Sequence, residues 1–185
     1  QQYVQRGREK RINHDYKGAM DDFTKAIQSN PKFGQGYSGR GEIKYLLKKY
    51  EEAIEDFNKS IELGNIDGEI YFFLGLSKVE LKDYQGAIQE YNKGIALDTT
   101  IYAGLYFARA ECKMLLKDYK GAIDDFKKII KKNPKSSNSY IKIGDAKVEL
   151  KDYMGAIADY KKADSLGNKD AKIKLKNVNK RFYIK

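Results

Sequence analysis

The sequence predicts an all-α protein in which five helical hairpins follow one another and a single helix completes the C-terminal end. Similar phrases return about every 34 residues, and the apolar residues inside each phrase have the spacing of one helix face. The 185 residues include only two prolines and are rich in Lys, Glu, Ala, Ile and Leu, which favour helix. We expect the hairpins at approximately 1–33, 34–67, 68–102, 103–136 and 137–168, and a capping helix at 169–185.

The clearest mark of the repeat is an alanine that stands three residues after a tyrosine. The five alanines are 34, 34, 35 and 34 residues apart: Ala19, Ala53, Ala87, Ala122 and Ala156. A column of small residues keeps the same period: Gly7, Gly41, Gly75, Ala110 and Gly144. So does a column of aromatic residues: Phe23, Phe57, Tyr91, Phe126 and Tyr160. Five copies at this spacing indicate a tandem repeat, and the one-residue insertion falls near Asp98-Thr99-Thr100, where we expect a turn.

Each repeat unit is expected to form two helices joined by a short turn. In the first unit Ala19, Phe23 and Ala26 lie on one face of the second helix. An aspartate stands where the second helix begins in four of the units, at Asp15, Asp83, Asp118 and Asp152, and can cap its free N–H groups. The small residues of the first helix leave room for the second helix to approach closely.

These columns resemble the tetratricopeptide repeat (TPR), in which an aromatic, a small residue, an alanine, a second aromatic and a proline recur every 34 residues. The resemblance covers residues 1–168 and implies a right-handed superhelical solenoid with a concave inner face. Three departures are visible: only Pro31 and Pro134 fill the proline position, the family's Leu before the small residue is present only as Leu74, and lysines replace the family's second aromatic of the first helix. These lysines are Lys10, Lys44, Lys78, Lys113 and Lys147.

The last seventeen residues fit an amphipathic helix that covers the fifth hairpin. Ala171, Leu175, Val178 and Phe182 have the spacing of one helix face, which we expect to be buried. The basic residues between them are expected to face water: Lys172, Lys174, Lys176, Lys180 and Arg181.

The composition makes a catalytic, metal-binding or cofactor-binding function improbable. His14 is the only histidine and is expected in a turn, and Cys112 is the only cysteine and is expected to be buried within a helix. The adjacent carboxylates Asp21-Asp22 and Asp124-Asp125 are expected on a solvated face rather than as a catalytic pair. We therefore predict no enzyme activity and no cofactor.

The concave face is the expected binding surface. In the resembling family the first helix of each hairpin lines it, and the corresponding positions here include Val4 and Ile141 beside nine residues predicted to bind a peptide. These nine are Arg8, Glu42, Phe72, Phe73, Leu76, Phe107, Glu111, Lys142 and Asp145. We predict a scaffold that binds a peptide segment of a partner protein through an apolar anchor with Lys or Arg nearby. The alternative for the phenylalanines is packing between neighbouring hairpins.

The clamp with which some family members hold a chaperone's C-terminal carboxylate is absent. It needs two Lys, two Asn and an Arg, and the matching positions here hold Val4, Arg8, Gly39, Glu69 and Phe73. Binding of chaperone tails is therefore not predicted.

Charge supports a second hypothesis. The net charge of +10 is uneven, since the middle of the chain is mildly acidic and the last seventeen residues carry +6. Nucleic acid or another polyanion could bind the basic fourth repeat and final helix, and that affinity would fall steeply with salt. The basic residues of the fourth repeat are Lys127, Lys128, Lys131, Lys132 and Lys135. No continuous basic stripe is present, so nucleic acid ranks below a protein partner.

Three further expectations concern assembly and location. The chain starts on a first helix without a polar cap, so self-association through this N-terminal face is a third hypothesis. It begins with Gln1 rather than Met and is expected to be part of a longer protein, whose compartment is cytoplasmic or, after export, periplasmic. No run approaches the length of a membrane span or resembles a signal peptide, and the composition suggests an AT-rich bacterial genome.

Overall fold

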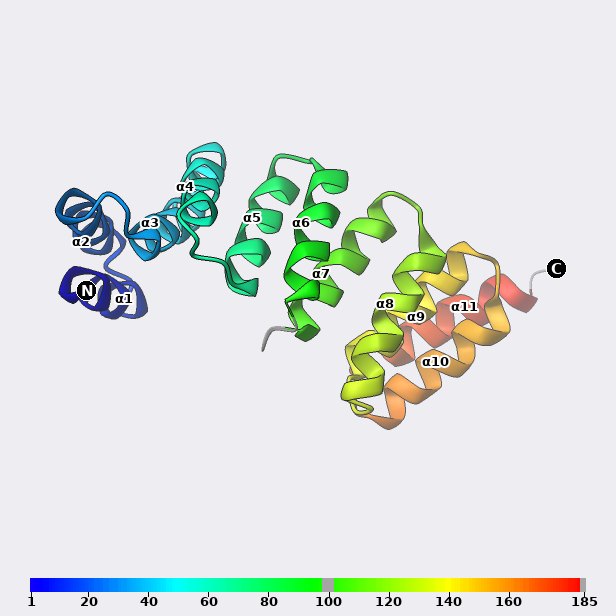
Figure 1. Cartoon of the computed structure of the whole chain (residues 1–185). Helices are drawn as coiled ribbons and strands as arrows, with labels where there is room; N and C mark the ends of the chain where they lie inside the picture. Colours follow the sequence, from blue (N-terminus) through cyan, green and yellow to red (C-terminus); the bar gives the residue numbers. More distant parts are fainter. Residues whose placement is uncertain (98–101, 184–185) are drawn as a thin grey trace. The chain divides into compact units, whose positions relative to one another are not determined.

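The computed structural model describes residues 1–97 and 102–183, with side chains described for 1–97 and 103–180. The predicted insertion at Asp98–Thr100 and the side chains of Arg181 and Phe182 lie outside these ranges. The described residues form eleven helices in five sequential hairpins plus a final helix, which confirms the predicted all-α repeat fold (Figure 1).

The chain divides into two compact units, which are described separately. Unit 1 is Gln1–Ile101 and unit 2 is Tyr102–Lys185. The helices of unit 1 are α1 (Gln2–Ile12), α2 (Tyr16–Ser29), α3 (Gly34–Leu46), α4 (Tyr50–Glu62), α5 (Gly68–Glu80) and α6 (Tyr84–Ala96). Those of unit 2 are α7 (Tyr102–Leu115), α8 (Tyr119–Lys132), α9 (Ser137–Glu149), α10 (Tyr153–Ser165) and α11 (Ala171–Tyr183). Odd-numbered helices up to α9 are the first helices of their hairpins, and α2 to α10 are the second helices.

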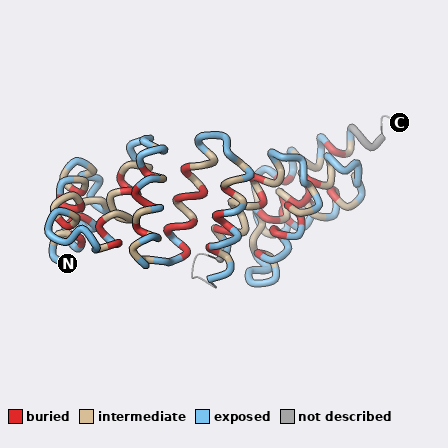
Figure 2. The backbone as a smooth tube through the Cα atoms, turned by 45° about the horizontal axis from the view of Figure 1, so that its top comes forward, coloured by how far each residue is buried: buried red, intermediate tan, exposed pale blue. Residues whose placement is uncertain are grey.

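The core of each hairpin lies where its two helices face one another (Figure 2). The spacing that recurs in each hairpin brings the small residue of the first helix against the aromatic ring of the second. A Cβ added at Gly7 would lie 3.0 Å from the Phe23 ring, and one at Gly144 would lie 2.4 Å from the Tyr160 ring. The small-residue column is therefore required by close helix approach, as the sequence predicts.

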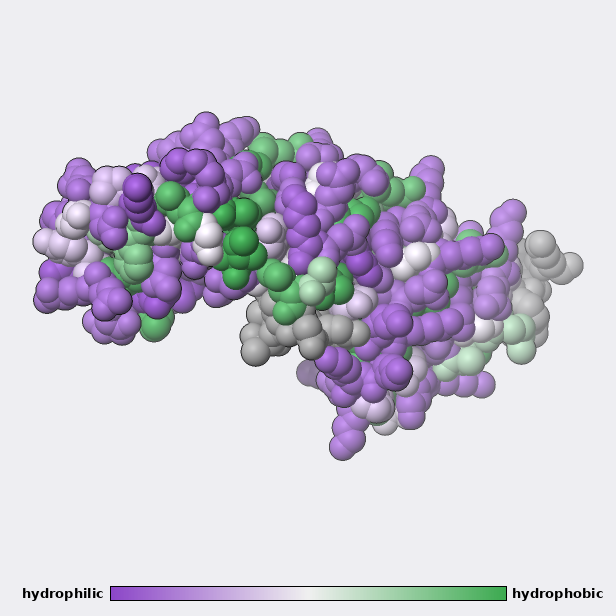
Figure 3. Space-filling view, viewed as in Figure 1, coloured by the Kyte–Doolittle hydropathy of each residue, from purple (hydrophilic) through white to green (hydrophobic). Residues whose placement is uncertain are grey.

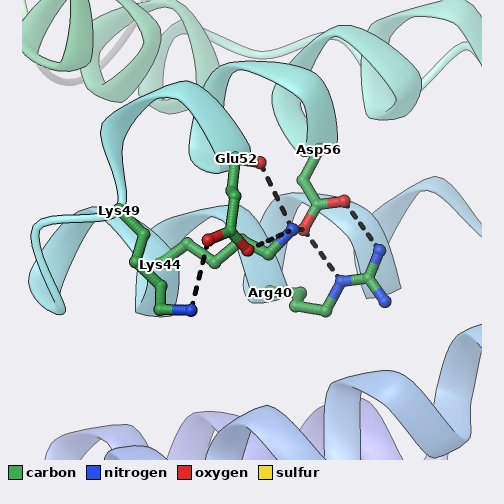
Figure 4. Close-up of polar contacts among 5 residues, drawn as sticks. All are labelled: Arg40, Lys44, Lys49, Glu52 and Asp56. Carbon is green, nitrogen blue, oxygen red and sulfur yellow. Dashed lines mark hydrogen bonds and ion pairs between the residues drawn. The ribbon is translucent and has the colours of Figure 1, made fainter.

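A partly buried ion pair joins the two helices of every hairpin. The lysine that replaces the family's second aromatic reaches an acidic side chain twelve positions later, at 2.6 to 2.9 Å. The pairs are Lys10–Asp22, Lys44–Asp56, Lys78–Glu90, Lys113–Asp125 and Lys147–Asp159. In three hairpins an arginine holds both oxygens of the same carboxylate, as Arg40 does with Asp56 at 2.8 and 2.7 Å (Figure 4).

These pairs correct one prediction from the sequence. Asp21 and Asp124 are exposed as expected, but Asp22 and Asp125 are buried. Adjacent residues on a helix point in directions about 100° apart, so one of two neighbours can face the solvent while the other faces the preceding helix. The hydrogen bonds from Arg6 hold the pKa of Asp22 down at about 2, although its burial opposes this shift.

The turns inside the hairpins have the same conformation throughout. Asp15, Asp83, Asp118 and Asp152 each accept a hydrogen bond from a backbone N–H three residues later, which confirms the predicted caps. The residue before each capping position has a positive φ of 60° to 64°, and none of these residues is glycine: they are His14, Lys48, Lys82, Lys117 and Lys151.

The final helix packs on the fifth hairpin. Ala171 and Val178 are buried in one cluster with Ala156, Tyr160 and Ala163, and Leu175 packs against it. Lys174 differs from the prediction, because it is partly buried and pairs with Asp145 of α9 at 2.7 Å. Among the described residues, none of the helices combines the length and hydrophobicity needed to cross a lipid bilayer.

Candidate functional site

The first helices of unit 1 line a hollow of about 150 Å³. We call it the unit 1 hollow. Its rim comes from α1, α3 and α5, and the rings of Phe23 and Phe57 from the second helices form part of its floor. Three of the residues predicted from the sequence line it: Arg8, Glu42 and Phe73. The predicted residues Phe72 and Leu76 are half-buried on α5 and do not line it.

The shape of the hollow follows from two small residues of α3. A Cβ at Gly39 would lie 2.3 Å from the Phe23 ring, so the missing side chain is what lets this buried ring pack against α3 beneath the hollow. Ser38 accepts a hydrogen bond at 3.2 Å from Asn65, whose amide also donates to buried Ser60 at 2.9 Å. This network holds the loop between α4 and α5 against α3 and fixes one wall.

The charges of the unit 1 hollow are mixed. Arg11 of α1 forms an ion pair and hydrogen bond with Glu42 of α3, across two consecutive first helices. Burial raises the pKa of Glu42 above its usual value, and Arg11 opposes this effect. Asp67 accepts from the backbone N–H of Ile70 at the start of α5, whereas the exposed Glu69 in the same first turn makes no such cap. Glu69 is thus the rim carboxylate that the protein's own contacts leave most accessible.

Aromatic side chains form a continuous group beside the hollow. The ring of Phe73 lies 5.5 Å from that of Tyr45, 5.9 Å from Phe72 and 6.2 Å from Phe57, and Phe72 lies 6.3 Å from Tyr91. Both phenylalanines are half-buried, so each packs against its own hairpin and still presents part of its ring. Figure 3 shows hydrophobic surface gathered over the region of α4 and α5.

Unit 2 contains the other four predicted residues. Phe107 packs on Phe126 with ring centres 5.4 Å apart, and the Lys142 ammonium is 6.0 Å from the centre of the Phe107 ring. Glu111 pairs with the same Lys142 at 2.9 Å. Phe107, Glu111 and Lys142 are therefore brought together on α7 and α9.

Asp145 belongs to a different part of unit 2. It accepts from the Tyr160 hydroxyl at 2.7 Å, pairs with Lys174, and lines a cavity of about 370 Å³ with Met114 and Val178. The structure thus gives each predicted groove carboxylate, Glu42, Glu111 and Asp145, a cation of the same chain.

Two other residues were expected on the concave face and are buried instead. Val4 is 2 % exposed among Ala19, Phe23 and Ile43, and Ile141 is 5 % exposed in the cluster with Tyr160. Their position is at the boundary between the concave face and the contact of the two helices. Small aliphatic side chains at this boundary turn into the core.

Several residues of these sites were not predicted: Arg11, Asn65, Glu69 and Lys174. Arg11 stands three residues after Arg8, which is one helix face, so its position could have been inferred from helical spacing. Lys174 could not, because its partner Asp145 is on another helix.

His14 and Cys112, the only histidine and cysteine, lie in environments that fit a structural role. His14 is an exposed turn residue whose Nδ1 lies 3.0 Å from the Tyr16 hydroxyl. Cys112 is 1 % exposed, and burial raises the pKa of its thiol to about 11. Within the described ranges, no three His, Cys, Asp or Glu side chains are arranged to hold a metal ion.

The fold and the hollow define a helical-repeat protein whose first helices present a polar and aromatic face. The sequence profiles of the tetratricopeptide repeat match residues 35–63, 68–100, 105–136 and 137–170. The chain belongs to the tetratricopeptide repeat family. Proteins of this family act as protein–protein interaction scaffolds, are typically without enzyme activity, and have protein partners.

Solved structures of other repeat proteins are similar over most of their length. The crystal structure of MamA has a TM-score of 0.81 at 26 % identity and covers 92 % of each chain. YrrB, described as a TPR protein with an unusual peptide-binding site, has a TM-score of 0.81 at 17 % identity and covers 96 % of this chain and 90 % of its own. PilW, a type IV pilus biogenesis factor, has a TM-score of 0.76 at 18 % identity, with 97 % and 90 % covered. No protein with curated function matches the sequence.

Proposed function

We propose that this chain is a scaffold that binds a peptide segment of a partner protein on the face formed by its first helices. The observation that carries the proposal is the unit 1 hollow, where Arg8, Glu42 and Phe73 meet around a cavity of about 150 Å³. A hollow of this size accepts one side chain of a peptide rather than a whole ligand. The family's role as interaction scaffolds and the peptide-binding site named for YrrB support the proposal.

The contacts refine the expected partner. An apolar side chain can rest on the exposed part of the Phe73 ring, which the buried Phe57 ring supports from behind, and aromatic contacts of this kind dominate the energy of interfaces. Arg11 already neutralises Glu42, so the carboxylate available to a basic residue of the partner is exposed Glu69. In unit 2, Phe107, Glu111, Lys142 and Asp145 are proposed to contact the same partner.

The test uses a random peptide library displayed on phage and selected on the whole chain. Gln35 is exposed on α3 and lines the hollow, so the variant Gln35→Trp fills the hollow without removing a buried contact. We expect the affinity of the selected peptides to fall about tenfold or more. The matched control is Gln89→Trp, at an exposed position of α6 in the same unit. If the selected peptides bind the Gln35→Trp variant as tightly as they bind the control, the hollow is not the binding site.

Charge at the rim gives a second readout. Glu69→Lys should weaken selected peptides that contain Lys or Arg and leave uncharged ones unaffected. Equal weakening of both kinds would argue against a basic residue beside the anchor.

A further inference from the structure

The positive charge of the protein belongs to one unit. Unit 1 contains 15 Lys and Arg against 16 Asp and Glu, whereas unit 2 contains 21 against 10. The net charge of +10 is therefore the sum of a nearly neutral unit and a strongly basic one.

Most acidic side chains of unit 2 are already used inside it. Asp118 and Asp152 accept backbone hydrogen bonds as helix caps. Four others pair with cations on neighbouring helices: Glu111, Asp125, Asp145 and Asp159. Because these carboxylates neutralise interior and groove cations, they do not offset the lysines on the outer surface.

Five of these lysines form what we call the lysine face. Lys127, Lys128 and Lys131 lie on α8, and Lys161 and Lys162 occupy equivalent positions 34 residues later on α10. All five are exposed, and within the part of the chain that the structure describes none has an acidic partner within ion-pair distance. Helices α8 and α10 are the second helices of consecutive hairpins and both pack on α9, and the surface in this region is mostly hydrophilic (Figure 3).

The equivalent surface of unit 1 is different. Lys25, Lys59 and Lys93 stand at the position of Lys128 and Lys162, but each pairs with an acidic residue of its own helix, at 2.6 to 2.9 Å. At the position of Lys127 and Lys161, unit 1 has Thr24, Asn58 and Asn92. The uncompensated cations are thus a property of unit 2 and not of the repeat.

We propose that the lysine face is a second binding surface, which takes an acidic segment of a polypeptide rich in Asp and Glu. All five cations are lysines, whose compact ammonium groups suit a flexible row of carboxylates better than the bidentate recognition that arginine provides. Within residues 103–180 no aromatic side chain is fully exposed, so the face lacks the stacking platform expected for single-stranded nucleic acid. The lysine face belongs to the second helices of unit 2 and the hollow to unit 1, so the two surfaces share no residue.

The probe is fluorescently labelled poly-L-glutamate, titrated with the whole chain at low and at physiological salt. The test variant is Lys127→Gln with Lys161→Gln. The matched control is Asn58→Glu with Asn92→Glu, which changes exposed residues at the equivalent positions of unit 1 and lowers the net charge by the same amount. We expect the affinity for poly-L-glutamate to fall roughly threefold to tenfold in the test variant and less than about twofold in the control.

Three results would overturn the proposal. The first is no binding of poly-L-glutamate at low salt, and the second is an equal loss in the test variant and the control, since that reflects net charge alone. The third is tighter binding, at the same salt, to a single-stranded oligonucleotide or to phosphatidylserine vesicles, because the occupant would then be nucleic acid or membrane.

Discussion

The two units share one repeat but use its charges differently. In unit 1 Lys25, Lys59 and Lys93 of the second helices are paired with acids on their own helices, and a hollow opens on the first helices. In both units other acids form ion pairs between helices, but in unit 2 the five lysines of the lysine face have no acidic partner within ion-pair distance. The comparison teaches that in a repeat protein the residue type at a position does not determine its role, because the same lysine column is neutralised in one unit and free to bind in the other.

The strongest test of the difference concerns the buried carboxylates. Asp125→Asn removes the charge that holds Arg109 and Lys113, which are only 16 % and 19 % exposed, so we expect a loss of about 3 kcal/mol in the free energy of unfolding. Asp22→Asn should cost only about 1 kcal/mol, because Arg6 and Lys10 are 45 % and 32 % exposed and can be solvated. Urea unfolding followed by circular dichroism measures both, and equal losses would show that partner exposure is unimportant here.

A smaller difference is expected at the close approach of the two helices. Gly144→Ala would place a methyl group 2.4 Å from the Tyr160 ring and should destabilise the protein by about 2 kcal/mol. Gly7→Ala should be nearly neutral, since the gap to Phe23 is 3.0 Å and alanine has the higher helix propensity. The fourth hairpin supports this expectation, because Ala110 faces Phe126 at the equivalent position. Thermal unfolding of both variants checks the prediction, which fails if Gly7→Ala is the more harmful.

The acid stability of unit 1 should depend on Asp22. Its pKa is about 2 in the folded protein against an ordinary value of 3.8, so its contribution is fully present above pH 4 and is lost as the pH falls toward 2. We expect this contribution to be about 1 kcal/mol, since solvent screens the exposed Arg6 partner. Urea unfolding from pH 5 to pH 2 should therefore show a shallower decline for Asp22→Asn than for the unaltered chain. Parallel curves would contradict the ion pair.

The smallest expected effect concerns the helix caps. Asp118→Ala in unit 2 should cost about 1 kcal/mol, because the side chain accepts from the Gly121 N–H at 3.0 Å. Lys49→Ala at the equivalent position of unit 1 should cost almost nothing, since Lys49 makes no side-chain cap. Urea unfolding midpoints of the two variants separate these outcomes, and a cost for Lys49→Ala as large as for Asp118→Ala would contradict the assignment.

Much of the fold could be predicted because its signals are local and recur. The small column, the aromatic column and the four aspartate caps are each visible in one unit and confirmed by the next. The ion pairs between helices could not be predicted in the same way. Lys44 and Asp56 recur with the period, but pairing them requires the rotation of both helices, which the sequence pattern does not specify.

The candidate site was predictable only in part for the same reason. The position of Val4 and Phe72 in the repeat is shared, yet Val4 is buried and Phe72 is half-exposed, because neighbouring side chains decide how a boundary residue turns. The ion pairs of Glu42, Glu111 and Asp145 come from residues about 30 positions away, so their neutralisation depends on contacts between hairpins.

The positive φ before each second helix has a practical consequence. An L-residue in this conformation costs roughly 1 kcal/mol more than glycine would, and the chain accepts that cost at five turns. Lys48, Lys82, Lys117 and Lys151 are exposed at these turns. Replacing any one of them with glycine would therefore remove the backbone cost without removing a packed side chain. The thermal stability of the protein could therefore be raised at each of these turns separately, and by a similar amount at each.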